Sequence, residues 1–187
     1  PTSVLAFIEN HDTDRFLGEG DNLPMLKQAS TLLLTTRRIP QLYYGTEIMM
    51  NGVKNKSDGY VRKDFPGGWV DDKETALTAE GRSKIQNDCY NFYKTILNWR
   101  KGNDVIAKGS MTQFMVQNGV YAYARQHEGK TVFVMLNGTD SATAVPLKFY
   151  KEILKGAKQG KDILSGRTIA FREELKMGAR ESLVIEL

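Results

Sequence analysis

The sequence predicts an α/β segment over residues 1–101, followed by an antiparallel β-sandwich over residues 102–187. Two observations support this division. The first part alternates apolar strand-like runs with segments of helical period, an order typical of parallel β/α units. The second part holds short β-rich runs with turn residues about every 8–12 positions, which is typical of an antiparallel sandwich. We expect the boundary near Gly102-Asn103.

The composition narrows the class of protein. The chain has 187 residues, of which 41% are hydrophobic and 26% charged, and this excludes a disordered or collagen-like chain. No apolar run approaches the ~20 residues of a membrane span. The net charge of +4 is not concentrated in a basic stripe. We therefore expect neither nucleic acid nor a membrane as a partner, and the lone Cys89 excludes an intrachain disulfide.

Two strands and a helix are expected at the start of the first part. The continuous apolar run at residues 4–8 is typical of a strand buried on both faces of a parallel sheet. Asn22 is a suitable N-cap, and Pro24 suits the first helical turn. One apolar side follows at helical spacing: Met25, Leu26, Ala29, Leu32 and Leu33. Residues 39–44 form the second short apolar run.

A long polar stretch, residues 51–76, precedes the last helix of this part. Ser83 to Gln86 has the form of a capping box, which marks a helix start. The expected apolar side is Ile85, Cys89, Phe92, Ile96 and Trp99. Gly102 suits the position just after the helix.

The second part is expected to be made of short strands. Residues 120–124 and 131–136 are β-rich, and Asn118-Gly119 predicts a two-residue hairpin turn between residues 115–117 and Val120. Further strands are expected at 143–147, 168–171 and 182–187.

A lysine cluster lies between these strands: Lys151, Lys155, Lys158 and Lys161. With Gly156 and Gly160 among them, these lysines indicate a solvated helix end or turn. Phosphate binding is the alternative interpretation.

The residues that indicate chemistry follow the first apolar run. The strand-like segment ends in Asn10-His11-Asp12-Thr13-Asp14-Arg15. In a β/α barrel, catalytic groups lie at the C-terminal ends of the strands. These residues alone also allow a structural interpretation, in which they cap the loop or satisfy buried backbone groups.

Four segments together resemble the α-amylase family, glycoside hydrolase family 13. Asn10-His11-Asp12 after an apolar strand is similar to the family's fourth conserved region, at the end of barrel strand seven. Residues 39–47 resemble its eighth strand, and residues 98–103 the end of its eighth helix. Residues 62–69 resemble a loop of neopullulanases and cyclomaltodextrinases, notably those of bacterial starch-utilisation systems.

The resemblance implies a fold and a catalytic residue. Residues 1–101 would be the last two β/α units of a (β/α)8 TIM barrel, with strands 7 and 8, followed by the family's C-terminal β-sandwich. Asp12 would be the third carboxylate of the catalytic trio, which binds ring hydroxyls and stabilises the transition state. His11 would donate to a hydroxyl of the same sugar, and Asn10 would hold the turn or Asp12 itself.

Three further residues are substrate-binding candidates. Arg15 matches a family position near the substrate, and the alternative is an ion pair with Asp14 or Glu19. Phe65 and Trp69 lie in the long polar stretch, where flat rings suit the apolar face of a glucose. The alternative for both aromatic residues is that they pin this loop to the barrel.

The resemblance also implies what the sequence lacks. A retaining glycosidase needs a nucleophilic carboxylate and a second carboxyl group ~5–5.5 Å away. The family carries these on strands four and five, and no segment here resembles those motifs. We therefore expect a C-terminal fragment that is inactive alone, that joins the upstream part of the same enzyme, and that self-associates through exposed barrel edges.

The implied substrate of the parent is an α-1,4-linked glucan or maltooligosaccharide. No cofactor is expected in this segment; calcium occurs in some members of the family, and no ligand cluster here argues for it. By analogy with the family, a periplasmic location is favoured and a cytoplasmic one stays open. Two alternatives remain for the sandwich, namely a non-catalytic carbohydrate-binding module and a purely structural cap over the barrel helices.

Overall fold

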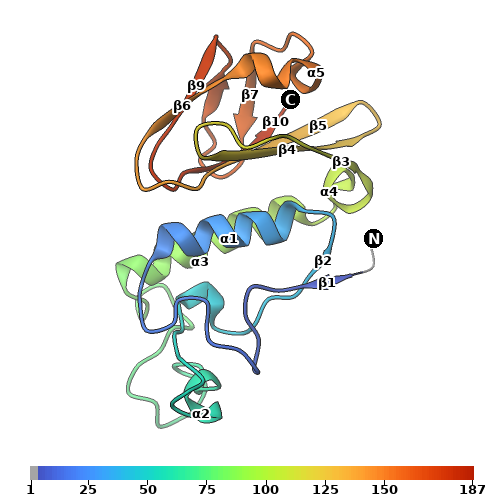
Figure 1. Cartoon of the computed structure of the whole chain (residues 1–187). Helices are drawn as coiled ribbons and strands as arrows, with labels where there is room; N and C mark the ends of the chain where they lie inside the picture. The colour runs from blue at the N-terminus through green and yellow to red at the C-terminus, as the bar shows by residue number, and fades with distance from the viewer. Residues whose placement is uncertain (1–3) are drawn as a thin grey trace.

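The computed structural model describes residues 4–187 and arranges them in layers (Figure 1). The helices are α1 (Leu23–Thr35), η1 (Thr46–Ile48), α2 (Asp58–Val61), α3 (Lys84–Arg100), α4 (Asp104–Lys108), η2 (Leu147–Tyr150) and α5 (Lys151–Leu154). The strands are β1 (Leu5–Ala6), β2 (Ile39–Pro40), β3 (Ser110–Gln113), β4 (Val120–His127), β5 (Lys130–Asn137), β6 (Thr143–Pro146), β7 (Gln159–Asp162), β8 (Thr168–Ala170), β9 (Glu174–Met177) and β10 (Ser182–Glu186). In Figure 1, α1 and α3 form a layer between the β-sheets and the β1–β2 pair.

The strands β1 and β2 are parallel neighbours, and the chain between them contains α1. Asn22 caps α1 by accepting a hydrogen bond from the Met25 N–H, and Pro24 lies in the first turn, as predicted. The predicted buried strand at residues 4–8 is wrong in extent and burial, because β1 has two residues and Leu5 is 53% exposed. Within residues 4–187, β2 is the one strand paired with β1, so the rest of the run meets solvent.

The helix α3 packs against α1 through a shared apolar cluster. Ser83 and Gln86 form the predicted capping box, and Gly102 follows the helix with a φ of 77°. The cluster between the two helices contains Leu23, Leu26, Leu34, Cys89, Phe92, Tyr93 and Ile96. The predicted apolar side is therefore confirmed at its centre, while Ile85 in the first turn remains exposed.

The second half is an antiparallel β domain of two sheets. A six-stranded sheet has the order β3-β4-β5-β10-β7-β8, and β6 pairs with β9 in a second sheet. Side chains alternate along β4 and β5, so each strand presents apolar groups to both faces. One face of the large sheet packs on the second sheet through a core that includes Phe133, Met135, Val145 and Leu175.

Five of the predicted strands of this half, at 120–124, 131–136, 143–147, 168–171 and 182–187, are confirmed with ends that differ by at most three residues. Asn118 and Gly119 form the predicted turn, with positive φ at both residues. The strand preceding this turn was predicted at residues 115–117 but lies earlier, at β3, and Gln117 makes a single bridge to Val120. The strands β7 and β9 were not predicted.

The other face of the large sheet packs on the helices. Tyr123, Val132 and Val134 point to this side and contact Val105 and Ile106 of α4. The hydroxyl groups of Tyr123 and Thr35 are hydrogen-bonded, which ties β4 to the end of α1. The large sheet is therefore buried on both faces. No helix in residues 4–187 is long and apolar enough to cross a membrane.

Candidate functional site

The loop after β1 presents Asp12 to solvent. The Asn10 side-chain oxygen accepts a hydrogen bond of 2.8 Å from the Asp12 N–H, and the Thr13 hydroxyl accepts one of 3.0 Å from the Asn10 N–H. These short local bonds are typical of Asn and Thr in turns, where the side chain replaces a backbone partner. The Asp12 side chain is 59% exposed. The structure thus brings Asn10, His11 and Asp12 together and gives Asn10 the role of holding the turn.

The Asp12 carboxylate lies in an alternating cluster of charges. Its oxygens are 3.1 Å from Nε2 of His11 and 3.2 Å from a terminal nitrogen of Arg62. Nζ of Lys54 is 3.8 Å from the same carboxylate and donates a 2.9 Å hydrogen bond to the Asp12 carbonyl. Asp58 contacts both cations, at 3.7 Å from Lys54 and 3.2 Å from Arg62. Two carboxylates and two cations therefore face one another on one surface.

Arg62 connects this cluster to the backbone of the β1 loop. Its Nε donates a 3.0 Å hydrogen bond to the His11 carbonyl, while its terminal nitrogen reaches Asp12. A guanidinium is planar and presents its donors in a fixed fork, so this pair of contacts restrains the loop and the carboxylate at once. The remaining lone pairs of Asp12 stay open to hydroxyl donors.

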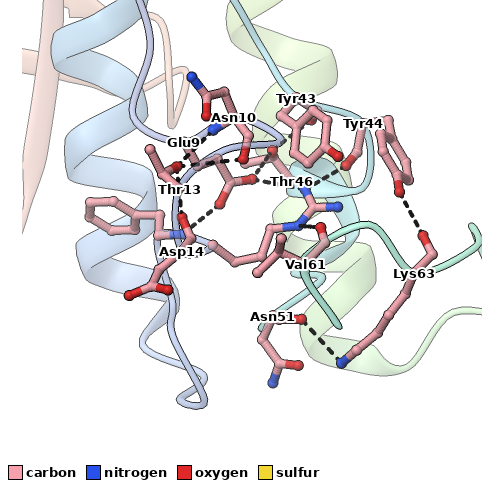
Figure 2. A network of polar contacts seen from close by, with 12 residues as sticks. Glu9, Asn10, Thr13, Asp14, Tyr43, Tyr44, Thr46, Asn51, Val61 and Lys63 are labelled. Carbon is pink, nitrogen blue, oxygen red and sulfur yellow. Dashed lines mark hydrogen bonds and ion pairs between the residues drawn. The ribbon is translucent and has the colours of Figure 1, made fainter. Parts of the chain in front are cut away.

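A buried ion pair supports the loop from behind. Arg15 donates a hydrogen bond of 3.2 Å to the Glu9 carboxylate. It donates two more to backbone carbonyls, 3.0 Å long to Val61 and 2.7 Å long to Tyr44. Glu9 also accepts hydrogen bonds from the Phe16 N–H and the Thr46 hydroxyl. Figure 2 shows Glu9 facing Thr46, with Tyr43 and Tyr44 beside them.

The position of Arg15 corrects one expectation. Arg15 pairs with Glu9, and the predicted pairing with Asp14 or Glu19 is wrong. Asp14 instead accepts a hydrogen bond from the Lys54 N–H, and Glu19 pairs with Lys56. Because Arg15 is almost completely buried, the structure places it behind the exposed carboxylate cluster.

The two aromatic candidates differ in exposure. Phe65 is half-buried, whereas Trp69 is 63% exposed. The loop at Trp69 is held by its backbone, because the Asp72 carboxylate accepts hydrogen bonds from the Gly67 and Trp69 N–H groups. An exposed indole on a loop that its own backbone holds is poorly suited to pinning and well suited to contact with a ligand.

Three members of the site were not predicted from the sequence as site residues. Lys54, Asp58 and Arg62 follow each other at a spacing of four residues, which joins neighbours on a helix turn. That spacing was the available signal, and α2 places Asp58 and Arg62 at its two ends. Glu9 was also missed, although a carboxylate that closes an apolar strand indicates a buried partner.

A resident metal finds no support in the described part of the chain. No group of three or more His, Cys, Asp or Glu side chains there has the arrangement to hold an ion. The charged cluster around Asp12 contains two carboxylates, each already in contact with cations, and an ion would have to displace Lys54 or Arg62.

Comparisons with known proteins concern the chain as a whole. The chain is 33% identical over 168 residues to a cyclomaltodextrin glucanotransferase of Thermoanaerobacterium thermosulfurigenes, with 86% of this chain and 21% of the relative covered. It is 30% identical over 170 residues to an α-amylase of Niallia circulans, with 87% of this chain and 29% of the relative covered. An α-amylase structure from Geobacillus thermoleovorans, complexed with acarbose, superposes with a TM-score of 0.75 at 23% identity. The match covers 99% of this chain and 39% of that structure's chain.

These matches define the class of protein that the chain resembles: it is similar to cyclomaltodextrin glucanotransferases and α-amylases over 86–87% of its own length. More particularly, residues 111–186 match the family model described as the cyclo-malto-dextrinase C-terminal domain. The chain spans less than a third of the length of the curated relatives named above.

Proposed function

We propose that this chain is the C-terminal part of a retaining α-glucan hydrolase of the neopullulanase type. In this proposal, residues 1–101 are the last two β/α units of its barrel, residues 102–187 form its C-terminal domain, and Asp12 stabilises the transition state. The single observation that supports it most is the presentation of Asp12, which lies exposed next to His11 on a loop that directly follows a parallel strand.

The chemistry requires a group of this kind. Cleavage of a glycosidic bond develops positive charge at the anomeric carbon, and hydrogen bonds to the sugar 2-OH strengthen in the transition state. A carboxylate that is already positioned stabilises this charge without reorganising. Asp12 would accept hydrogen bonds from ring hydroxyls through its open lone pairs, and His11 would donate a hydrogen bond to a hydroxyl of the same sugar. Phe65 and Trp69 would stack on neighbouring glucose units.

The nucleophile and the general acid/base are proposed to come from the upstream part of the same enzyme. The substrate would be an α-1,4-linked glucan or maltooligosaccharide, a class supported by the names of the relatives and by the acarbose and maltose complexes among the similar structures. Those structures share the fold of this chain at low sequence identity. This 187-residue chain alone would not turn over maltooligosaccharide.

The test uses the full-length parent enzyme. Asp12→Asn removes the charge and keeps the shape, so we expect kcat on maltooligosaccharides to fall by at least about 10²-fold, the usual effect of losing one group that stabilises transition-state charge. Asp21→Asn is the matched control, because Asp21 is also an exposed carboxylate and forms no ion pair in residues 4–187. An Asp12→Asn enzyme that retains its turnover would contradict the proposal.

A structural role for the β domain is a second candidate that a specific observation favours. The large sheet buries its second face on α4 and α1 and carries Tyr123 and Arg125 into that interface. This is the arrangement expected of a cap that shields barrel helices. Affinity electrophoresis of the whole chain in starch separates a structural cap from a carbohydrate-binding module. If the Trp69→Ala variant is still retarded by starch, the β domain binds carbohydrate. If it is no longer retarded, the β domain has the structural role.

A further inference from the structure

A groove on the outer side of the β domain is lined by positive charge. It lies between the η2–α5 segment and the chain that joins β8 to β9, and it has a volume of about 840 Å³. This volume lies within the ~300–1,000 Å³ of typical ligand sites. The cations that line it are Lys148, Lys151, Lys155, Lys158 and Arg172. In Figure 1, α5 lies across the sheet from α1 and α3, so this groove is separate from the Asp12 site.

The cations of this basic groove have no carboxylate partner in the part of the chain that the structure describes. Eight basic side chains elsewhere lie within 4.0 Å of a carboxylate, namely Arg15, Lys27, Lys54, Lys56, Arg62, Lys108, Arg167 and Arg180. Other exposed lysines, such as Lys84 and Lys94, also make no such pair within residues 4–187, so the groove differs in gathering its cations around one concave surface. Two carboxylates, Glu173 and Glu174, also line the groove and leave it with a net positive charge. Unpaired cations facing one concave surface attract an anionic ligand, because their potentials add there.

The floor of the groove differs from its rim. Leu147 and Leu154 are buried beneath the cations, and Phe171 is half-buried beside them. An apolar floor suits the C–H face of a sugar ring, while ammonium groups at the rim suit phosphate as point charges. A flat membrane surface would instead be met by a protruding patch, and a concave groove cannot follow it.

We propose that the basic groove binds an α-glucan that carries phosphate monoesters. The choice of an α-glucan rests on the proposed function. The parent enzyme would then cleave a glucan at the Asp12 site and hold the same kind of glucan in the basic groove. Glucose units would lie on Leu147, Leu154 and Phe171, and their phosphates would meet Lys151, Lys155 and Lys158.

The test measures binding of the whole chain to maltodextrin bearing phosphate monoesters and to the same maltodextrin after phosphatase treatment. We expect binding to the phosphorylated form alone, weakened by added salt. Replacing Lys151, Lys155 and Lys158 together by Gln should weaken binding by about tenfold, because exposed charge pairs contribute modestly each. The matched control replaces Lys84, Lys94 and Lys101 by Gln, which removes the same charge from exposed positions in and after α3.

A second variant guards against loss of folding. Glu173→Gln with Glu174→Gln removes the negative charge from the groove and should tighten binding several-fold, a gain that an unfolded protein cannot show. Unchanged binding by the triple lysine variant, equal binding to the dephosphorylated maltodextrin, or tighter binding to anionic vesicles would each overturn the proposal. These measurements need no turnover, so an active Asp12→Asn parent would remove the proposed function and leave the phosphate-binding result standing.

Discussion

At the scale of single residues, Arg15 is, with Arg125, one of the two largest fully buried side chains of residues 4–187, and its charge is shared among three acceptors. Its guanidinium carbon also lies 4.0 Å from the ring centre of Tyr43 and 4.9 Å from that of Tyr44. A buried ion pair contributes little over an apolar replacement of the same shape, yet removing one partner leaves an uncompensated buried charge. Arg15 therefore holds the β1 loop, η1 and α2 together.

Arg15→Met should destabilise the protein strongly. We expect the free energy of unfolding in urea to fall by about 3–5 kcal/mol, because Glu9 then keeps its charge in a buried site. Arg37→Met is the control, since Arg37 is exposed and should change stability by less than about 0.5 kcal/mol. Adding Glu9→Gln to Arg15→Met should cost much less than the sum of the two single changes. Additive losses would show that the pair is not coupled.

Cys89 should be chemically inert in the folded protein. Burial against α1 raises the pKa of its thiol from 9.0 to about 12, and only the thiolate reacts with alkylating agents. Iodoacetamide at about pH 8 should therefore leave the folded chain unlabelled and label it fully in urea. Because the fold favours the neutral thiol, its contribution to stability is complete below pH 9.0 and is lost as the pH rises toward about 12. Labelling of the folded chain at the rate of the unfolded one would contradict this.

The sequence predicted single residues well where their partners are local. Asn10 holds the turn that presents Asp12 through hydrogen bonds with Asp12 and Thr13, which lie two and three residues away. The partner of Arg15 was missed because Asp14 and Glu19 are both nearer to Arg15 in sequence than Glu9 is. The direction of Arg15 toward Glu9 is also set by the carbonyls of Val61 and Tyr44, which are 46 and 29 residues away and meet Arg15 only through the tertiary fold.

At the scale of elements, helix caps and turns were predicted because their partners are local, whereas strands depend on distant partners. Asn22 and Ser83 start their helices through side-chain bonds that span three residues, and a sequence displays these directly. The strand β7 reads Gln-Gly-Lys-Asp, without β-branched or aromatic residues, and only its pairing with β10 and β8 makes it a strand. Propensity predicts poorly wherever distant partners supply the pairing.

Gly119 is an element-scale test, because its turn sets the register of β4. Its φ is 78°, and a Cβ there would lie 2.3 Å from Cγ2 of Thr139. Gly129 has the matched φ of 79° in open space, so Gly129→Ala should cost only the ~1–2 kcal/mol of a left-handed residue. Gly119→Ala should cost distinctly more in thermal or urea unfolding. Thr139→Ser removes Cγ2 and should recover the difference; equal costs at the two glycines would refute the steric argument.

At the scale of the whole molecule, Arg125 joins the β domain to the helices. It is buried on β4 and donates hydrogen bonds of 2.8 to 3.2 Å to the carbonyls of Thr35, Ile106, Gly109 and Ser110. Burial lowers the pKa of its guanidinium, yet these carbonyls replace the water it has lost. The division at residues 101 and 102, proposed from the sequence, is therefore not expected to separate two independently folding units.

Arg125→Met should loosen the contact between the helices and the sheet. The substitution leaves the Thr35 and Ile106 carbonyls without their donor. Each unsatisfied carbonyl should lower the free energy of unfolding by about 1–3 kcal/mol. The wild type should unfold in a single transition, with helix-detected and Tyr-detected signals coinciding. The variant should melt earlier, and its amides at the end of α1 and in β4 should exchange faster. Arg167→Met is the control, because Arg167 is exposed and pairs only at the surface.

The exposed edge formed by β1 and β2 makes a prediction about association. Leu5 and Ile39 are each about half exposed, and Phe7 lies beside them with a large exposed surface. An apolar strand edge with unpaired backbone groups is a template for pairing with another chain. Sedimentation velocity of the 187-residue chain should therefore show oligomers that increase with concentration. Leu5→Lys should reduce this association without lowering the melting temperature, because charge on an edge strand blocks pairing. Val70→Lys, at a fully exposed apolar residue outside this edge, should leave the association unchanged. If the wild-type chain is monomeric at every concentration, the edge is not a pairing surface, and the exposure of Leu5 and Ile39 would no longer be a reason to place further barrel strands beside β1.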